Sequence, residues 1–236
     1  MKLYNAWYCP FAQRAWMALA YKDIDFELVE IDPYDATDWW LEVSRGAGLV
    51  PVVVQPNGDG SDTTIVESNR ILEYLDDYYP DSTLIFADNP NQRAEQKYWM
   101  DQVSNKITPY FYRFLKTPEA GAAQDEAREN MLEGLMTITR AMSSEDPYFA
   151  GANVSAVDIA LFPFAYRIDA LLGHYHNYTL PREGDKWERY HRWYDAILDV
   201  PAFQATATDH ADYKNRLVEH YLPYSEGEGQ KDVAAV

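Results

Sequence analysis

Cysteine is nearly absent from this chain, because Cys9 is the single one among 236 residues. One cysteine excludes an internal disulfide, so we expect a reducing compartment and a cytoplasmic protein. The N-terminus lacks the basic and then apolar segments of a signal peptide. No apolar run approaches the ~20 residues that cross a bilayer, so we expect no membrane-spanning helix.

Basic residues are also scarce, with 20 Lys and Arg against 38 Asp and Glu and a formal net charge of −18. This imbalance argues against nucleic acid and against anionic membrane surfaces as partners. We interpret the excess of acidic residues as a contribution to solubility. Hydrophobic residues make up 47% of the chain, which is ordinary for a globular protein with a core.

The first 80 residues alternate between strand and helix patterns. Strands are predicted over 2–5, 26–31, 50–54 and 63–66. Helices are predicted over 10–22, over 36–45, and from Ser68 as N-cap to 78. The first half makes a parallel βαβ unit and the second an antiparallel hairpin. We therefore predict an α/β N-terminal domain with a mixed four-stranded sheet over residues 1–80.

The composition changes after residue 80, and the remaining patterns are helical. We predict a linker over 81–90, an all-α C-terminal domain over 91–223 and a disordered tail over 224–236. Helices are predicted to begin at Asn89-Pro90, at Thr117-Pro118-Glu119 and after Ser155, and to cover 186–198 and 209–221. The helix after Ser155 is nearly all apolar, so we expect it at the centre of its domain. Ser155 and Asp158 are assigned to helix capping.

Cys9 stands immediately before Pro10, a residue suited to the first position of a helix. This places Cys9 at the N-cap, where free N–H groups and the positive end of the helix dipole favour thiolate over thiol. Arg14, about one turn further on, can add positive charge. A lone cysteine is more often a small buried hydrophobe, but its place at a helix start favours the reactive interpretation.

Four local motifs make the chain resemble a cytosolic glutathione transferase of the cysteine type, most like the omega class and with kinship to the lambda class. The motifs are Cys9-Pro10-Phe11-Ala12-Gln13-Arg14, Leu49-Val50-Pro51, Glu67-Ser68 and Ser155-x-x-Asp158. The resemblance covers about residues 1–222 by layout. It implies a thioredoxin-like first domain, glutathione as co-substrate without a metal, and commonly a homodimer.

The resemblance also implies a set of glutathione-binding residues: Phe11, Val50, Pro51, Glu67 and Ser68. Ser68 and its helix N-terminus suit the γ-glutamyl carboxylate, and Glu67 suits the ammonium group. Val50, before the cis-proline position, offers a strand-like edge to the cysteinyl backbone. Taken singly, Glu67-Ser68 is explained equally well as a helix cap, whereas Val50-Pro51 is better explained as a strand start and Phe11 as a core aromatic.

The sequence departs from the omega pattern at one position. That class usually carries a lysine in the second helix region, which meets the glycyl carboxylate of glutathione, and the nearest register here holds Thr37. Arg45 and Lys22 are left as possible substitutes.

The function implied by the resemblance is that of a glutathione-dependent thiol transferase and reductase acting through Cys9, including dehydroascorbate reduction and removal of glutathione from small conjugates. Two alternatives stay open: a transferase that conjugates glutathione to apolar electrophiles, and a non-catalytic ligand-binding protein. The pocket for the second substrate, a small thiol, disulfide or electrophile, is expected between the domains. Its candidate residues are Tyr8, Tyr110, Phe114 and Tyr166.

Tyr4 and Tyr8 raise a competing mechanism, since other classes of the family that the chain resembles use a hydroxyl to stabilise the glutathione thiolate for conjugation. Tyr4 is expected to pack within a strand, whereas Tyr8 adjoins Cys9 and stays a candidate. The five histidines do not cluster in the sequence, and His174 and His176 fall in a predicted loop. Two histidines without further ligands are weak evidence for a metal site, so none is predicted.

Overall fold

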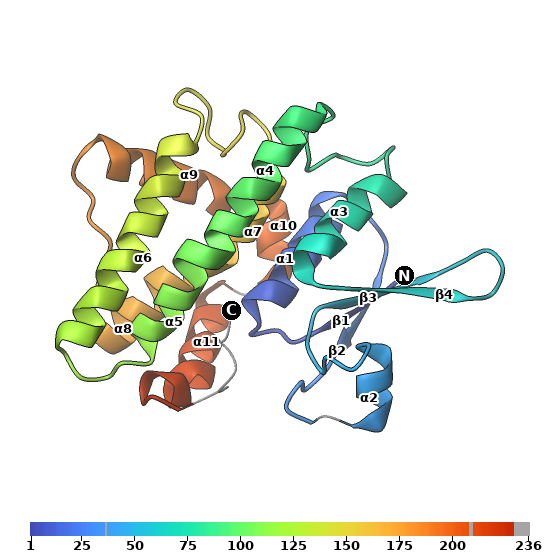
Figure 1. The fold of residues 1–236 in the computed structure, drawn as a ribbon, viewed down its shortest axis with the longest axis horizontal. Coiled ribbons are helices and arrows are strands. Elements are labelled where there is room, and N and C mark those ends of the chain that lie inside the picture. Colours follow the sequence, from blue (N-terminus) through green and yellow to red (C-terminus); the bar gives the residue numbers. More distant parts are fainter. Residues whose placement is uncertain (36, 208–209, 229–236) are drawn as a thin grey trace. The chain divides into compact units, whose positions relative to one another are not determined.

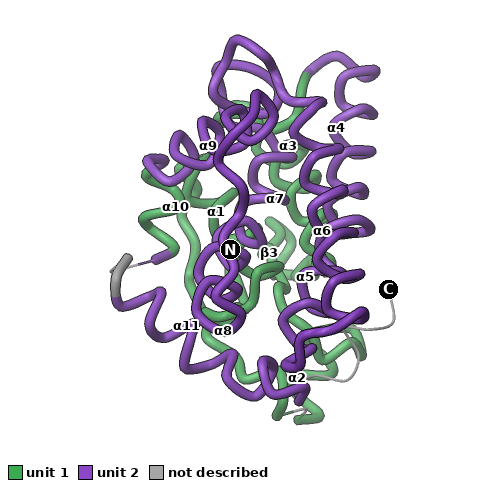
Figure 2. Tube along the Cα trace, turned by 90° about the vertical axis from the view of Figure 1, so that its left-hand side faces the viewer, with its two compact units in different colours: residues 1–87, 201–206 green, residues 88–200, 207–236 purple. Residues whose placement is uncertain are grey.

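The computed structural model describes every residue except Ala36, 208–209 and 229–236. The chain forms two compact units (Figure 2). Unit 1 contains Met1–Ala87 and Pro201–Thr206, and unit 2 contains Asp88–Val200 and Ala207–Val236. Across the described residues, no helix is both long enough and apolar enough to cross a membrane.

Unit 1 is built on a four-stranded sheet with the order β2-β1-β3-β4 (Figure 1). The strands are β1 (Lys2–Asn5), β2 (Glu27–Glu30), β3 (Val52–Pro56) and β4 (Asp62–Val66). β1 pairs in parallel with β2, while the pairs β1–β3 and β3–β4 are antiparallel. The predicted mixed sheet and its antiparallel hairpin are confirmed, with the turn between β3 and β4 following Pro56.

The helices of unit 1 are α1 (Pro10–Tyr21), α2 (Asp38–Val43), α3 (Ser68–Tyr78) and α10 (Pro201–Thr206). The prediction of Ser68 as an N-cap is wrong: Ser68 is the first helical residue, and Glu67 is the N-cap. The short helix α10 was not predicted. It packs on α1, where Gln13 donates a hydrogen bond of 3.1 Å to the Thr206 hydroxyl.

A buried ion pair holds the far end of α1. Lys22 Nζ lies 2.6 Å from Asp76 Oδ1 in α3 and 2.8 Å from the carbonyl oxygen of Thr83, and both charged side chains are completely buried. Asp76 also accepts hydrogen bonds from the backbone N–H groups of Ile85 and Phe86. Because the two charges compensate each other away from water, they fix α1, α3 and the segment after α3 together.

Unit 2 is helical throughout. Its elements are α4 (Pro90–Gln102), the π-helix η1 (Val103–Ile107), α5 (Thr108–Leu115), α6 (Ala122–Ala141), α7 (Ala156–Arg167), the π-helix η2 (Ile168–Leu172), α8 (Gly173–His176), α9 (Asp185–Leu198) and α11 (His210–Ser225). The capping signal at Asn89 is confirmed, since its side chain accepts from the N–H groups of Asn91 and Gln92.

Three predictions for unit 2 are wrong in detail. Helix α6 begins at Ala122 after Gly121, not at Pro118. His174 and His176 lie in the short helix α8, not in a loop. Helix α11 continues to Ser225, whose side chain and that of Tyr224 are buried, and the rest of the predicted tail from residue 229 lies outside the described residues.

Helix α7 is the core of unit 2, and every one of its residues is buried. The Ser155–Asp158 capping box is confirmed. The Asp158 carboxylate accepts from the Ser155 N–H (2.7 Å) and hydroxyl (2.6 Å), from the Phe149 N–H (2.8 Å) and from Trp193 Nε1 (2.7 Å). A residue predicted only to cap one helix thus also holds the preceding loop and helix α9.

Gly134 in α6 allows a close approach to the π-helix η1. A Cβ at this position would lie 2.4 Å from the carbonyl oxygen of Lys106 and 2.9 Å from its carbonyl carbon. Both atoms belong to the backbone, so a side-chain rotation cannot relieve the contact. Residues Val103–Ile107 form this π-helical turn between α4 and α5, and the turn packs on α6 where Gly134 meets Lys106.

We expect Gly134→Ala to lower the free energy of unfolding by about 1 to 3 kcal/mol, measured by urea denaturation, because the new methyl group overlaps backbone atoms. In an unobstructed helix the same change would stabilise by about 1 kcal/mol. The matched control is Gly173→Ala, also at a helical glycine, where the nearest atom is 3.8 Å from the new Cβ. A stabilising effect of Gly134→Ala equal to that of the control would contradict the role assigned to this glycine.

Candidate functional site

Cys9 is the N-cap of α1, as predicted, with extended backbone angles φ −78° and ψ 121°. Its carbonyl oxygen accepts the first helical hydrogen bond from the Gln13 N–H at 3.0 Å, and its own N–H donates to Ala6 at 2.8 Å. The residue is half-buried, and Pro10 occupies the first helical position. No acidic residue lies in the first turn of α1, so no carboxylate there offsets the positive end of the helix.

The Val50–Pro51 peptide bond is cis, as the motif resemblance implied. Pro51 is buried and Val50 is half-buried, directly before β3 begins at Val52. Leu49, the preceding residue, is 53% exposed.

Glu67 and Ser68 form the start of α3. Glu67 has φ 70° and ψ 115°, a backbone region that costs energy for a residue with a side chain. Its carboxylate makes no capping hydrogen bond, which leaves it available for a ligand's cation. Ser68 is 7% exposed and lies at the helix N-terminus, where N–H groups without helical partners converge.

Arg14 connects the helix of Cys9 to the start of α3. Its guanidinium lies 5.1 Å from the centre of the Phe11 ring. It also donates to the Ser68 hydroxyl at 3.3 Å and to Asn69 Oδ1 at 3.2 Å, and the residue is only 1% exposed. Sequence reasoning placed Arg14 one turn from Cys9 but missed this link, because residues 14 and 68 are far apart in the chain and no local signal joins them.

Phe11 was predicted both on the inner face of α1 and as a ligand contact. The residue is half-buried with Arg14 against its ring, so it is not a fully enclosed core aromatic. This arrangement is compatible with a contact to a bound molecule.

An aromatic cluster lies beside Cys9. The rings of Tyr8 and Tyr34 are stacked with centroids 6.3 Å apart, and Trp7 meets Tyr8 edge-on at 5.6 Å. Tyr34 is 50% exposed and was not predicted to take part in the site. Tyr4 packs in the core of unit 1 against Trp40, with ring centroids 5.7 Å apart, in agreement with the prediction.

Three candidates for the second-substrate pocket belong to unit 2. Tyr110 is half-buried, with the guanidinium of Arg113 5.1 Å from its ring centre. Phe114 is 1% exposed and stacks on His176, and Tyr166 is 2% exposed, where burial raises the pKa of its hydroxyl. Phe114 and Tyr166 are therefore core residues within unit 2, and a pocket role for the three stays a prediction.

The residues near the position of the omega-class lysine differ in whether they are available to contact a ligand's carboxylate. Lys22 is excluded, because its charge is enclosed with Asp76 and it lies at the opposite end of α1 from Cys9, about 20 Å away along the helix. Thr37 caps α2 by accepting from the Trp40 N–H at 3.3 Å. Arg45 is exposed just after α2, so it stays a candidate for contact with a carboxylate.

Metal-ligating side chains do not gather in the part of the chain that the structure describes, where no group of three or more His, Cys, Asp or Glu is placed to hold an ion. His176 instead has structural contacts, with its ring nitrogens 3.3 Å from Gln124 Nε2 and 3.1 Å from the Leu115 carbonyl oxygen.

Family models and related proteins match most of the length of this chain. A family model described as "Glutathione S-transferase, N-terminal domain" matches residues 3–83, and one described as "Glutathione S-transferase, C-terminal domain" matches residues 121–196. Glutathione S-transferase DHAR2 of Arabidopsis thaliana is 32% identical over 173 residues, covering 73% of each chain. Glutathione S-transferase omega-1 of Sus scrofa is 27% identical over 217 residues, covering 91% of this chain and 83% of that protein.

A solved structure shows the same fold. The crystal structure of glutathione transferase Omega 3C from Trametes versicolor aligns with a TM-score of 0.74 and 29% sequence identity, covering 93% of this chain and 90% of that one. The mixed sheet with its cis-proline and the helical unit match the architecture that the resemblance implied. With both family models matched and relatives of the omega and DHAR types along most of its length, this chain belongs to the glutathione S-transferase family.

Proposed function

We propose that this protein is a glutathione-dependent thiol transferase and reductase in which Cys9 forms a mixed disulfide with glutathione. The observation that carries the proposal is the position of the only cysteine at the N-cap of α1, directly before Pro10 and half-buried. The omega and DHAR relatives support this class of chemistry. A hydroxyl at this position could only stabilise a glutathione thiolate, whereas a cysteine can form a bond with it.

Glutathione binding is proposed to use five residues of unit 1, which are Phe11, Val50, Pro51, Glu67 and Ser68. The N-terminus of α3, with Ser68, suits the γ-glutamyl carboxylate, and the uncommitted carboxylate of Glu67 suits the ammonium group. Val50, before the cis bond to Pro51, offers backbone groups to the cysteinyl part. Phe11 presents its partly exposed ring to the tripeptide.

The proposed reaction proceeds in two exchange steps. The Cys9 thiolate attacks the glutathione sulfur of a mixed disulfide, so a Cys9–glutathione bond forms, the substrate thiolate leaves and it takes a proton from water. A second glutathione thiolate then attacks the glutathione sulfur bound to Cys9, which releases glutathione disulfide and restores the Cys9 thiolate. The second glutathione is required because the chain has no other cysteine to resolve the bond.

The substrates proposed are small glutathione conjugates and disulfides, together with dehydroascorbate. We also propose a homodimer, as is common in this family. A conjugating transferase remains the second candidate, favoured by Tyr8, whose ring lies beside Cys9 in the chain and stacks on the exposed Tyr34.

The first test is covalent. Incubation with glutathione disulfide should add one glutathionyl group to the wild-type protein and none to Cys9→Ser, as measured by intact mass, and added glutathione should remove it. Absence of an adduct on the wild type would contradict the thiol-transferase proposal. Conjugation of a chlorinated aromatic electrophile that survives Cys9→Ser would instead establish the conjugating transferase.

The second test concerns ionisation at the helix N-terminus. At pH 6 the folded protein should react with iodoacetamide about tenfold faster than the urea-unfolded chain, because a free cysteine has a pKa of about 8.5 and is then mostly protonated. Cys9→Ser gives the background rate. Equal rates for the folded and unfolded chains would show that the helix does not favour the thiolate.

The third test concerns the glutathione ammonium group. Glu67→Gln should raise KM for glutathione by about tenfold or more, because a charge-assisted hydrogen bond is lost, while kcat changes much less. The matched control is Glu119→Gln, an exposed acid in unit 2, which should leave KM unchanged. An unchanged KM in Glu67→Gln with intact thermal stability would remove Glu67 from the site.

A further inference from the structure

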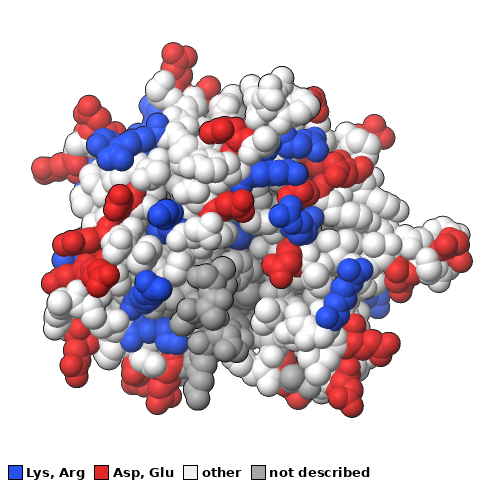
Figure 3. All heavy atoms as spheres, viewed as in Figure 1, with Lys and Arg blue, Asp and Glu red and all other residues white. Residues whose placement is uncertain are grey.

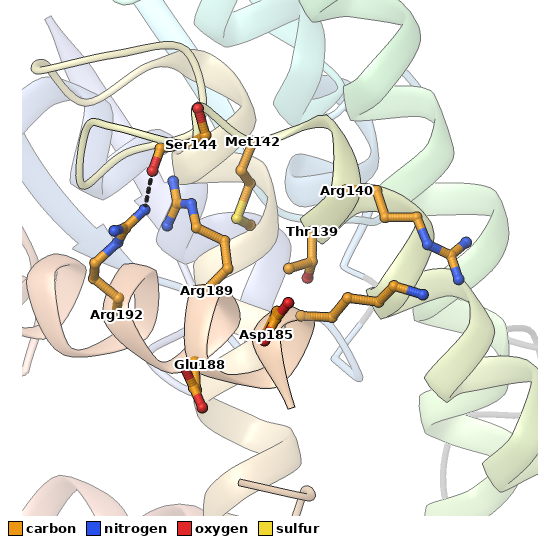
Figure 4. A pocket seen from close by; sticks show the side chains of 9 residues that line it. Thr139, Arg140, Met142, Ser144, Asp185, Glu188, Arg189 and Arg192 are labelled. Atoms are coloured by element: carbon orange, nitrogen blue, oxygen red, sulfur yellow. Dashed lines mark hydrogen bonds between the residues drawn. The ribbon is translucent and has the colours of Figure 1, made fainter. Parts of the chain in front are cut away.

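A cavity of about 510 Å³ lies within unit 2, between the end of α6 and the start of α9 (Figure 4). Residues of the loop after α6 also line it, including Ser144. In the close view, the side chains of Arg189 and Arg192 reach from α9 toward this loop, and Arg140 extends from the last turn of α6. The volume falls in the range of small-molecule sites.

The charge of this cavity is opposite to that of the chain. Its lining includes four basic side chains, Arg140, Lys186, Arg189 and Arg192, and two acidic ones, Asp185 and Glu188. The whole chain has 20 basic and 38 acidic residues, so one fifth of its cations line one cavity. On the face drawn in Figure 3, basic and acidic side chains are interspersed.

The two arginines of α9 are held in place by neutral groups. Arg189 donates to the carbonyl oxygens of Ser143 (2.6 Å), Pro147 (3.2 Å), Asp146 (3.1 Å) and Tyr148 (3.1 Å). Arg192 donates to the carbonyl oxygen of Ser144 at 2.6 Å. These bonds fix the loop and the guanidinium groups, so the positive charges are ordered before any ligand arrives.

None of the four cations forms a salt bridge within the described residues. Burial and the neighbouring charge of Arg192 lower the pKa of Arg189, which means that the two guanidinium groups repel each other. The carboxylates of Asp146 and Asp158 act in the opposite direction and compensate part of the positive charge. The loop carbonyl oxygens carry no net charge and add nothing to that compensation, whereas an anion in the cavity would reduce the repulsion that remains.

The basic side chains of the cavity still have N–H groups that can donate hydrogen bonds to such an anion. A guanidinium has five N–H donors, and Arg189 uses most of them on the loop, so it contributes mainly its charge. Arg192 has one hydrogen bond within the described residues, and Arg140 and Lys186, both exposed, have none there. Arginine donors in this number suit phosphate oxygens, which accept paired N–H bonds.

We propose that the cavity between α6 and α9 binds the diphosphate group of a small molecule, through Arg140, Lys186 and Arg192, with Arg189 adding charge. The site lies within unit 2 and is independent of Cys9 and of the proposed glutathione chemistry. Asp185 and Glu188, which complement the N-terminus of α9, oppose the anion and limit its affinity.

The test is titration calorimetry of the full chain with inorganic pyrophosphate at low ionic strength and without glutathione. We expect one site, weakened at least about tenfold by the double change Arg140→Gln with Lys186→Gln. Neither side chain makes a hydrogen bond within the described residues, so this variant should fold normally. The matched control removes two exposed lysines of unit 2 elsewhere, Lys106→Gln with Lys214→Gln, and should bind as the wild type does.

Two further titrations identify the class of ligand and test whether positive charge in the cavity drives binding. ADP binding more tightly than pyrophosphate would indicate a nucleotide, and equal or weaker binding would indicate an inorganic or simple organic diphosphate. Asp185→Asn with Glu188→Gln should tighten pyrophosphate binding. The proposal is overturned if wild type shows no binding at millimolar pyrophosphate, or if the double variant and the control weaken it equally. Mass-adduct formation at Cys9, measured in parallel, should be unchanged in every variant.

Discussion

A buried guanidinium is the constraint on which the proposed glutathione site depends. Arg14 has almost no contact with water, so its charge must be met by the Phe11 ring and by the oxygens of Ser68 and Asn69. These contacts hold the helix that begins after Cys9 against the helix that begins at Ser68. Removal of any one partner leaves a charge in a poorly solvated place, which is costly. The N-termini of α1 and α3, which the proposed site would use for the sulfur and for a carboxylate of glutathione, are thereby kept in a fixed relation.

Local signals predicted much of this fold, because their physics acts over a few residues. Pro10 after Cys9, the Asn89 cap and the Ser155–Asp158 box each marked a helix start, and the alternation of strand and helix patterns marked the strands. The π-helices and α10 were missed, since they depend on packing between distant segments. Gly134 illustrates this, because its missing side chain matters only against the backbone of Lys106.

The candidate site was predictable to the same extent. Cys9 and the cis bond at Pro51 follow from short motifs, but the roles of charged residues do not. Lys22 carries the right charge for a glycyl carboxylate, yet it forms a buried ion pair with Asp76, 54 residues away in the chain. Tyr34 was missed for a related reason, since its stacking on Tyr8 has no signature in the sequence around it.

Net charge describes the whole chain, whereas ligands respond to the field within a few ångströms. At physiological ionic strength that field is screened over about 8 Å. The formal charge of −18 therefore argues against large anionic partners such as nucleic acid, which meet a whole surface. It does not exclude a small anion in a cavity where four cations are gathered and two of them are fixed by loop carbonyls. The loop after α6 accounts for two of the four, because its backbone oxygens accept hydrogen bonds from Arg189 and Arg192, while Asp146 in the same loop offsets only part of their charge.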